Sequence, residues 1–188
     1  LGADGRPSLY APGHGDLVDA MRPLVLGQLK AQGVRFFVMS NVDNLAASVD
    51  PTLIGLHLSR GAKMTVDVVR KWAGDTGGGP AWLDGRLQII EAFRFPKGFD
   101  QGSIGVFNTN TFVIDLAACD REFALDRFVV SKKVDGREAL QFERLAGQLT
   151  AFLDAVYVEV ARSGSGGRFL PVKDPEELAA RRGEIERV

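Results

Sequence analysis

Short apolar runs of strand length alternate with segments of helical character along this chain of 188 residues. The clearest run is Val34–Ser40, which Gly33 and Asn41 bound and which has the composition of a buried strand in a parallel sheet. A helix is then predicted from Pro51, with Asp50 as its N-cap. Because strands that alternate with helices form layered sheets, we predict an α/β fold with a mostly parallel three-layer sheet.

The remaining elements are predicted from the same periodicities. Further strands are expected over residues 63–72, 87–95, 110–116, 157–161 and 169–172, and further helices over residues 16–21, 23–31 and 139–155. The helix over residues 139–155 rests on Leu145, Leu149 and Phe152, which recur at helical spacing. A last helix is expected after Asp174, because an N-cap aspartate followed by proline is typical of a helix start.

The composition excludes several classes of protein. Lys and Arg total 23 against 24 Asp and Glu, and no basic block appears, so a nucleic-acid partner is not expected. No apolar run approaches the roughly 18 residues that would span a membrane. The one cysteine, Cys119, excludes an internal disulfide framework and suits a reducing cytoplasm, and with only His14 and His57 beside it a structural zinc site is not expected. We therefore expect one cytoplasmic domain over residues 1–188.

Polar residues stand at the ends of two predicted strands. Asn41 and Asp43 follow the run that ends at Ser40, and ligands of open α/β sheets bind beyond the carboxyl ends of the strands. A carboxylate there suits Mg²⁺, which shares its oxygen ligands with phosphates. Lys173 ends the predicted strand 169–172, where a lysine can neutralise a phosphate. The alternatives are a turn with a helix cap and a solvated lysine.

Two glycine-rich segments are further candidates. Gly13 and His14 precede a predicted helix, where glycine lets a base or a phosphate approach the backbone and the helix N-terminus favours negative charge. The alternative is a helix-entry loop in which His14 is an ordinary surface residue. Gly77–Gly79 suggests a phosphate cradle but lacks the Gly-Lys-Ser/Thr ending of a P-loop, so a connection between two strands is the alternative.

Amide and carboxylate side chains also interrupt apolar segments. Asn108 and Asn110 lie at the entrance of an apolar strand, where their amides offer donors and acceptors to sugar hydroxyls. The alternative is an Asx turn. Glu91 is a charge inside an apolar stretch, which costs free energy unless it has partners.

The order of these segments, over about residues 10–180, resembles the UTP–glucose-1-phosphate uridylyltransferase family. The matching motifs are Pro-Gly-His-Gly-Asp at 12–16, Ser-Asn-x-Asp-Asn-Leu-Ala at 40–46, Asp-Pro at 50–51, Gly-Gly at 77–78, Ile-Glu at 90–91, Phe-Asn-Thr-Asn at 107–110, Gln-x-Glu at 141–143 and Arg-Phe-Leu-Pro-Val-Lys at 168–173. The related UDP-N-acetylhexosamine pyrophosphorylases share the Asp-Asn and Asp-Pro elements. Gly-His-Gly and Asn-Thr-Asn are closer to the glucose enzymes.

The resemblance implies a glycosyltransferase-A-like nucleotide-binding fold and synthesis of UDP-glucose and pyrophosphate from UTP and glucose 1-phosphate. On the nucleotide side it implies that Gly13 meets the uracil and that His14 lies near the sugar phosphate. It also implies that Asn41 contacts the nucleotide, that Asp43 ligates Mg²⁺ beside the α-phosphate, and that Lys173 lies between the two phosphate groups.

On the sugar side the resemblance implies that Gly78, Glu91, Asn108 and Asn110 hold the glucose hydroxyls. The sugar phosphate attacks the α-phosphorus of UTP in line. Because a phosphate monoester with a second pKa near about 6 is mostly dianionic at neutral pH, no general base is required. The reaction instead needs alignment and cancellation of negative charge.

The sequence departs from the family pattern in three places. The family's N-terminal glycine-rich loop, whose lysine grips the triphosphate, and the C-terminal β-helix domain of longer members are not in this sequence. Thr76 stands where many members have lysine. If nothing precedes Leu1 in the real molecule, we expect the chain to bind weakly and hardly to turn over; if Leu1 follows a further segment, we expect the parent to be an active enzyme. Two alternatives stay open: a non-catalytic module that binds nucleotide sugars, and a pyrophosphorylase for another sugar phosphate such as N-acetylhexosamine 1-phosphate.

Overall fold

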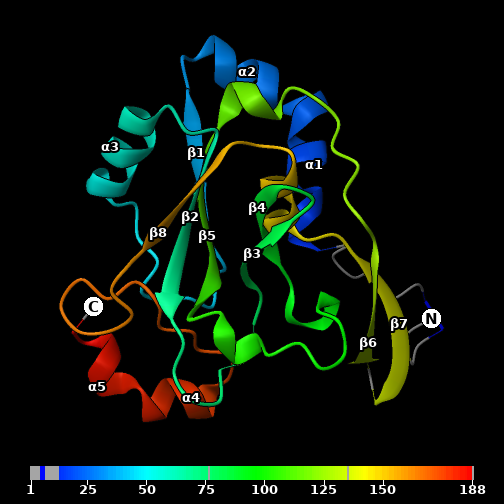
Figure 1. Cartoon of the computed structure of the whole chain (residues 1–188), viewed down its shortest axis with the longest axis vertical. Coiled ribbons are helices and arrows are strands. Elements are labelled where there is room, and N and C mark those ends of the chain that lie inside the picture. Colours follow the sequence, from blue (N-terminus) through cyan, green and yellow to red (C-terminus); the bar gives the residue numbers. More distant parts are fainter. Residues whose placement is uncertain (1–4, 7–12, 76, 135, 188) are drawn as a thin grey trace.

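The computed structural model describes residues 5–6, 13–75, 77–134 and 136–187. Its centre is a four-stranded sheet in the order β1-β5-β2-β8, and two separate hairpins flank it (Figure 1). The sheet strands are β1 (Phe36–Met39), β2 (Met64–Arg70), β5 (Val106–Asp115) and β8 (Ala155–Glu159). The hairpins are β3 (Gly79–Leu83) with β4 (Arg86–Ile90), and β6 (Phe128–Val134) with β7 (Arg137–Glu143).

Short helices connect these strands. The α-helices are α1 (Leu17–Leu24), α2 (Leu26–Ala31), α3 (Pro51–Arg60), α4 (Pro175–Ala180) and α5 (Arg182–Ile185). The 3-10 turns are η1 (His14–Asp16), η2 (Ala92–Arg94), η3 (Gln101–Ser103), η4 (Leu116–Cys119) and η5 (Ala146–Ala151). In the parts of the chain that are described, none of these helices has the length and apolar character needed to cross a membrane.

The central sheet is mixed, so the prediction of a mostly parallel three-layer sheet is wrong. β5 runs antiparallel to both β1 and β2, and β2 and β8 form the parallel pair. β1 pairs with β5 alone among the described strands, and its residues are only half-buried. The prediction failed because the apolar composition of a strand indicates its burial but not whether the neighbouring strands are parallel or antiparallel to it. The broader prediction of an α/β fold is confirmed.

Two local predictions fail where the periodicity is ambiguous. The helix expected over residues 139–155 is instead the second strand of a hairpin, the turn η5 and the start of β8. The helical spacing was misleading because the buried Leu149 belongs to a 3-10 turn, whereas Leu140 and Phe142 are exposed on β7. The strand expected over residues 87–95 is shorter and is the second arm of a hairpin, whose turn has Asp84 and Gly85 at positive φ.

The two predicted helix starts with capping aspartates are confirmed. The Asp50 side chain accepts a hydrogen bond from the Thr52 amide at 2.8 Å, and the Asp174 side chain accepts one from the Glu177 amide at 2.7 Å. The predicted strand 169–172 is reduced to a single bridge between Asn44 and Pro171. The helix expected from residue 23 begins at Leu26, because α1 continues through Pro23.

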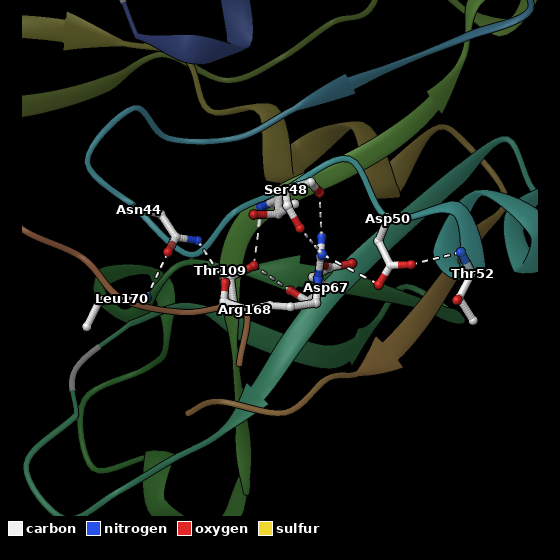
Figure 2. A network of polar contacts seen from close by, with 9 residues as sticks. Asn44, Ser48, Asp50, Thr52, Asp67, Thr109, Arg168 and Leu170 are labelled. Atoms are coloured by element: carbon white, nitrogen blue, oxygen red, sulfur yellow. Dashed lines mark hydrogen bonds and ion pairs between the residues drawn. The ribbon is translucent and has the colours of Figure 1, made fainter. Parts of the chain in front are cut away.

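A buried ion pair joins β2 to the segment that precedes α4. Asp67, in the middle of β2, is 1% exposed, and Arg168 is 8% exposed. Arg168 Nε donates to Asp67 Oδ2 at 2.9 Å, and the two terminal nitrogens donate to Ser48 Oγ and to the Ser48 carbonyl at 3.1 Å each (Figure 2). Burial raises the pKa of Asp67, and the hydrogen bond and charge of Arg168 oppose that rise.

Asn44 completes this network from the loop after β1. Its Nδ2 donates to the Arg168 carbonyl at 3.0 Å, and its Oδ1 accepts from the Leu170 amide at 2.8 Å (Figure 2). Thr109 of β5 donates its hydroxyl to the Asp67 carbonyl at 3.0 Å. The loop over residues 41–50, the two central strands and the segment over residues 168–173 are therefore held in one arrangement.

Replacement of Arg168 by methionine tests how much this pair contributes. The change leaves the Asp67 carboxylate buried without a counter-charge, and breaking a buried pair in this way costs about 3–5 kcal/mol of unfolding free energy. The measurement is urea unfolding followed by circular dichroism. Arg70→Met is the matched control, because the Arg70–Glu159 pair between the ends of β2 and β8 is 75% and 47% exposed and its loss is expected to cost less than about 1 kcal/mol. Equal losses in the two variants would contradict the assignment.

Candidate functional site

A pocket of about 220 Å³ lies where the loops after β1 and β4 and the segment before α4 meet the start of β5. All of the predicted site residues except Gly13 and His14 line it: Asn41, Asp43, Gly78, Glu91, Asn108, Asn110 and Lys173. They come from five separate segments of the sequence, so the fold brings them together.

Asn108 and Asn110 form one side of the pocket and hold each other in place. Asn108 Nδ2 donates to Asn110 Oδ1 at 2.7 Å, and the Asn110 amide donates to Asn108 Oδ1 at 3.0 Å. Asn110 has a φ of 58°, a left-handed conformation that asparagine tolerates better than most residues. The register shift opposite Asp67 accounts for it, because a bulge of this kind turns a side chain out of the normal alternation.

Gly78 and Glu91 form the neighbouring wall. A Cβ on Gly78 would lie 2.8 Å from the Ile90 carbonyl oxygen and 2.9 Å from Glu91 Oε2, so this position has no room for a side chain. The Gly78 carbonyl accepts a hydrogen bond from the Asn108 amide at 2.8 Å. Burial raises the pKa of Glu91, and the nearby charge of Arg94 partly opposes that rise.

Arg162 packs against two aromatic residues of the pocket lining and pairs with Asp75 in the segment after β2. Phe107 and Phe169 line the pocket and pack edge to face, with ring centroids 5.1 Å apart. The Arg162 guanidinium lies 5.2 Å and 5.5 Å from these two rings and 4.0 Å from the Trp72 ring. It also forms a two-pronged ion pair with Asp75, in which Nη2 donates to Oδ1 at 3.0 Å. Arg162 thus combines an ion pair with contacts to three aromatic rings.

Asp43 and Lys173 face the pocket from two adjacent segments. The Val172 amide donates to the Asp43 carbonyl at 2.8 Å, which sets the two segments side by side. The Lys173 amide donates to Glu177 Oε2 at 2.9 Å, so the backbone of Lys173 is tied to the start of α4. The two residues therefore line the same pocket.

The donor set fits a magnesium ion that is shared with a substrate. Within the described ranges, no three His, Cys, Asp or Glu side chains are grouped as a metal site. Mg²⁺ does not need such a cage, because it usually keeps several waters and takes one or two carboxylates together with substrate phosphates. Asp43, with the amide oxygen of Asn41 in the same pocket, meets that requirement.

Gly13 and His14 lie outside the lining of this pocket. A Cβ on Gly13 would lie 2.4 Å from the Arg144 carbonyl oxygen, and His14 Nδ1 accepts a hydrogen bond from the Ala146 amide at 2.9 Å. Burial lowers the pKa of His14, and the charge of Glu143 opposes that change. In the structure, therefore, the glycine permits a close approach of two backbones. Contact of either residue with a ligand stays a prediction, and Pro12 and Thr76 lie outside the described residues.

Sequence reasoning missed four structural contributors to the pocket: Asn44, Phe107, Arg162 and Phe169. An aromatic residue beside an apolar strand has the same pattern as a core residue, so periodicity alone does not single out Phe107 or Phe169. Asn44 belongs to the predicted polar run after β1 and was not singled out within it.

Comparisons with known proteins show the family of this chain. The family model for UTP–glucose-1-phosphate uridylyltransferase matches residues 3–185. The UTP–glucose-1-phosphate uridylyltransferase of Solanum tuberosum is 32% identical over 192 residues, which cover 94% of this chain and 39% of that protein. The chain thus spans about two fifths of the length of such relatives.

Two solved structures share the fold. A variant of UDP-glucose pyrophosphorylase from Leishmania major, in complex with UDP-glucose, is 26% identical with a TM-score of 0.73, and the match covers 93% of this chain and 44% of that one. A UDP-N-acetylglucosamine pyrophosphorylase described as putative, from Entamoeba histolytica, has a TM-score of 0.78 at 17% identity and covers 94% of this chain and 50% of that one, so it supports the fold alone. With its family model matched over nearly its whole length, this chain belongs to the UTP–glucose-1-phosphate uridylyltransferase family.

Proposed function

We propose that this chain is the nucleotide-binding catalytic portion, over residues 1–188, of an enzyme that forms UDP-glucose and pyrophosphate from UTP and glucose 1-phosphate. The observation that carries the proposal is that three distant segments, which bear Asn41 with Asp43, Asn110 and Lys173, line one pocket. The fold of the proposed domain is glycosyltransferase-A-like. The relative solved with UDP-glucose supports the choice of ligand.

The proposed chemistry is positioning and charge neutralisation. An oxygen of the glucose 1-phosphate attacks the α-phosphorus of UTP, the new P–O bond forms, and pyrophosphate leaves with the electrons of the broken bond. Lys173 stabilises the charge that the phosphates carry, and Asn41 contacts the nucleotide. Asp43 would hold Mg²⁺, which supplies further neutralisation of phosphate charge when it is bound. Because the attacking phosphate is already ionised near neutral pH, the pocket needs no general base.

The proposed sugar contacts use the opposite side of the pocket. Asn108 and Asn110 offer amide donors and acceptors to hydroxyls, and Glu91 accepts hydrogen bonds from hydroxyls when it is ionised. Gly78 allows Ile90 and Glu91 to approach its backbone closely, and in this proposal that backbone holds the sugar together with these side chains. In the same proposal Gly13 meets the uracil and His14 lies near the sugar phosphate, which extends the site beyond the pocket described here.

The binding experiment also distinguishes two alternative functions. A non-catalytic module would keep the pocket and bind UDP-glucose without turnover. A pyrophosphorylase for N-acetylhexosamine 1-phosphate would prefer UDP-N-acetylglucosamine, because shape and hydrogen bonding in the sugar pocket decide between such ligands.

Calorimetric titration with UDP-glucose in the presence of Mg²⁺ tests the proposal directly. Asn110→Ala is expected to weaken binding about fivefold, the equivalent of one lost hydrogen bond of about 1 kcal/mol. Lys173→Ala is expected to weaken it about tenfold to a hundredfold, because hydrogen bonds to charged groups are worth about 1.5–3 kcal/mol. Lys133→Ala, on the exposed strand β6, is the control. Unchanged affinity in both pocket variants, or tighter binding of UDP-N-acetylglucosamine, would overturn the assignment.

The pH dependence of UDP-glucose binding tests the role of Glu91. Burial raises its pKa, so protonation of Glu91 begins at a higher pH than for an ordinary glutamate. The neutral carboxyl loses acceptor strength toward sugar hydroxyls, so affinity should fall as the pH is lowered through that raised pKa, by at most about tenfold per pH unit.

Calorimetric titrations between about pH 5 and pH 8 measure this effect, and the variant changes no carboxylate other than Glu91. Glu91→Gln should flatten the profile, whereas Glu138→Gln on the exposed strand β7 should leave it unchanged. A profile that is identical in the wild type and in Glu91→Gln would contradict the proposed role of Glu91.

A further inference from the structure

Arg162, which follows β8, contacts two aromatic residues of the pocket described above, although it does not itself line that pocket. Its side chain is 14% exposed, and its Nη1 donates to the Arg70 carbonyl at 2.9 Å. The guanidinium therefore contacts both the end of β2 and the rings of Phe107 and Phe169. A largely buried charge is unfavourable unless it is paired, and Asp75 supplies the counter-charge.

Asp75 closes a turn directly after β2. Its Oδ2 accepts a hydrogen bond from the Trp72 amide at 2.6 Å, and its own amide donates to the Trp72 carbonyl at 3.1 Å. The hydrogen bond from Arg162 lowers the pKa of Asp75, so the carboxylate stays charged at neutral pH. The guanidinium also lies 4.0 Å from the centroid of the Trp72 ring. Arg162 thus holds both ends of this turn.

The turn leads into the glycine wall of the pocket. Asp75 stands two residues before Gly77, and two residues of chain span at most about 7 Å, so a large shift of one displaces the other. A Cβ on Gly77 would lie 3.5 Å from the Phe107 ring, so the Gly77 backbone packs on a ring that Arg162 also contacts. Gly78 follows, and its carbonyl is fixed to the Asn108 amide at 2.8 Å.

We propose that Arg162 is a positioning residue for this pocket. It fixes the turn at Asp75 and the rings of Phe107 and Phe169, and through them it sets the backbone at Gly77 and Gly78, which line the pocket. Arg162 acts through these neighbours and makes no contact with the ligand. The identity of that ligand, UDP-glucose, rests on the proposed function.

Two measurements on Arg162→Gln test the proposal. Amide nuclear magnetic resonance on the ¹⁵N-labelled chain reports the surroundings of Gly77 and Gly78 without a ligand, and calorimetry in Mg²⁺ reports the affinity for UDP-glucose. The variant is expected to shift both glycine signals and to weaken binding about tenfold, because displaced groups lose hydrogen bonds to the ligand. Arg162→Lys keeps the charge without the two-pronged geometry, and it should recover part of the affinity.

Asp75→Asn breaks the same ion pair from the other side, and it replaces Arg162→Gln if that variant fails to fold. If Arg162 acts through Asp75, the double variant should bind about as tightly as the weaker single variant, because the second change removes nothing further. Arg70→Gln is the matched control. It should keep the affinity and both glycine signals, because the Arg70–Glu159 pair is exposed and the Arg70 carbonyl is retained.

Unchanged affinity in Arg162→Gln, with a wild type that binds UDP-glucose, would overturn this inference and leave the proposed function standing. Losses that multiply in the double variant would also overturn it, because they would show that Arg162 and Asp75 act separately. A wild type that does not bind UDP-glucose would instead contradict the proposed function. The glycine signals then decide: shifted signals in Arg162→Gln would support the positioning role, and unchanged signals would overturn it.

Discussion

The guanidinium of Arg168 lies against the carboxylate of Asp67 in the middle of β2, and both walls of the pocket that Asn41, Asp43 and Lys173 line are attached to this pair. Burial of two charges is unfavourable unless their remaining hydrogen-bonding groups are satisfied. Here the rest of the guanidinium donates to Ser48, and the Arg168 carbonyl accepts from Asn44. The loop that bears Asp43 and the segment that bears Lys173 are therefore oriented by one buried network, which is what a reaction that depends on alignment requires.

The backbone carbonyl of Asp67 supports the opposite side of the pocket. Its carbonyl accepts the Thr109 hydroxyl at the point where the register of β2 and β5 shifts. That shift leaves Asn110 in a left-handed conformation, and the Asn108 side chain holds it there with two hydrogen bonds. The asparagine pair is thus shaped before any ligand arrives, because its conformation is fixed by the strand beneath it.

Local signals in the sequence were sufficient for the helix starts. Asp50 and Asp174 were predictable as caps because capping depends on a few neighbouring residues. Asn41 and Asp43 were singled out because they follow a predicted strand, and the structure brings them into one pocket with Lys173, although the strand predicted before Lys173 is only a single bridge. Their contact with a ligand stays a prediction.

The direction of β5 was not predictable in the same way, because it depends on which distant strands pair with it. Arg162 was missed for a similar reason: its role comes largely from Trp72, Asp75 and Phe107, which are remote in the sequence.

The charge of the pocket explains why its proposed ligands call for a cation. Among the described lining residues, Asp43 and Glu91 are acidic and Lys173 is the basic group, so the lining does not by itself attract the phosphates of UTP and glucose 1-phosphate. Burial raises the pKa of Glu91, which reduces the free-energy cost of placing that residue near phosphates because the neutral form becomes more accessible. Asp43, in contrast, has to be ionised, because only an ionised carboxylate holds Mg²⁺. The ion, when bound, makes this position attract phosphates instead of repelling them. The two acids are therefore expected to play different parts: Glu91 recognises hydroxyls, and Asp43 brings the positive charge that the phosphates need.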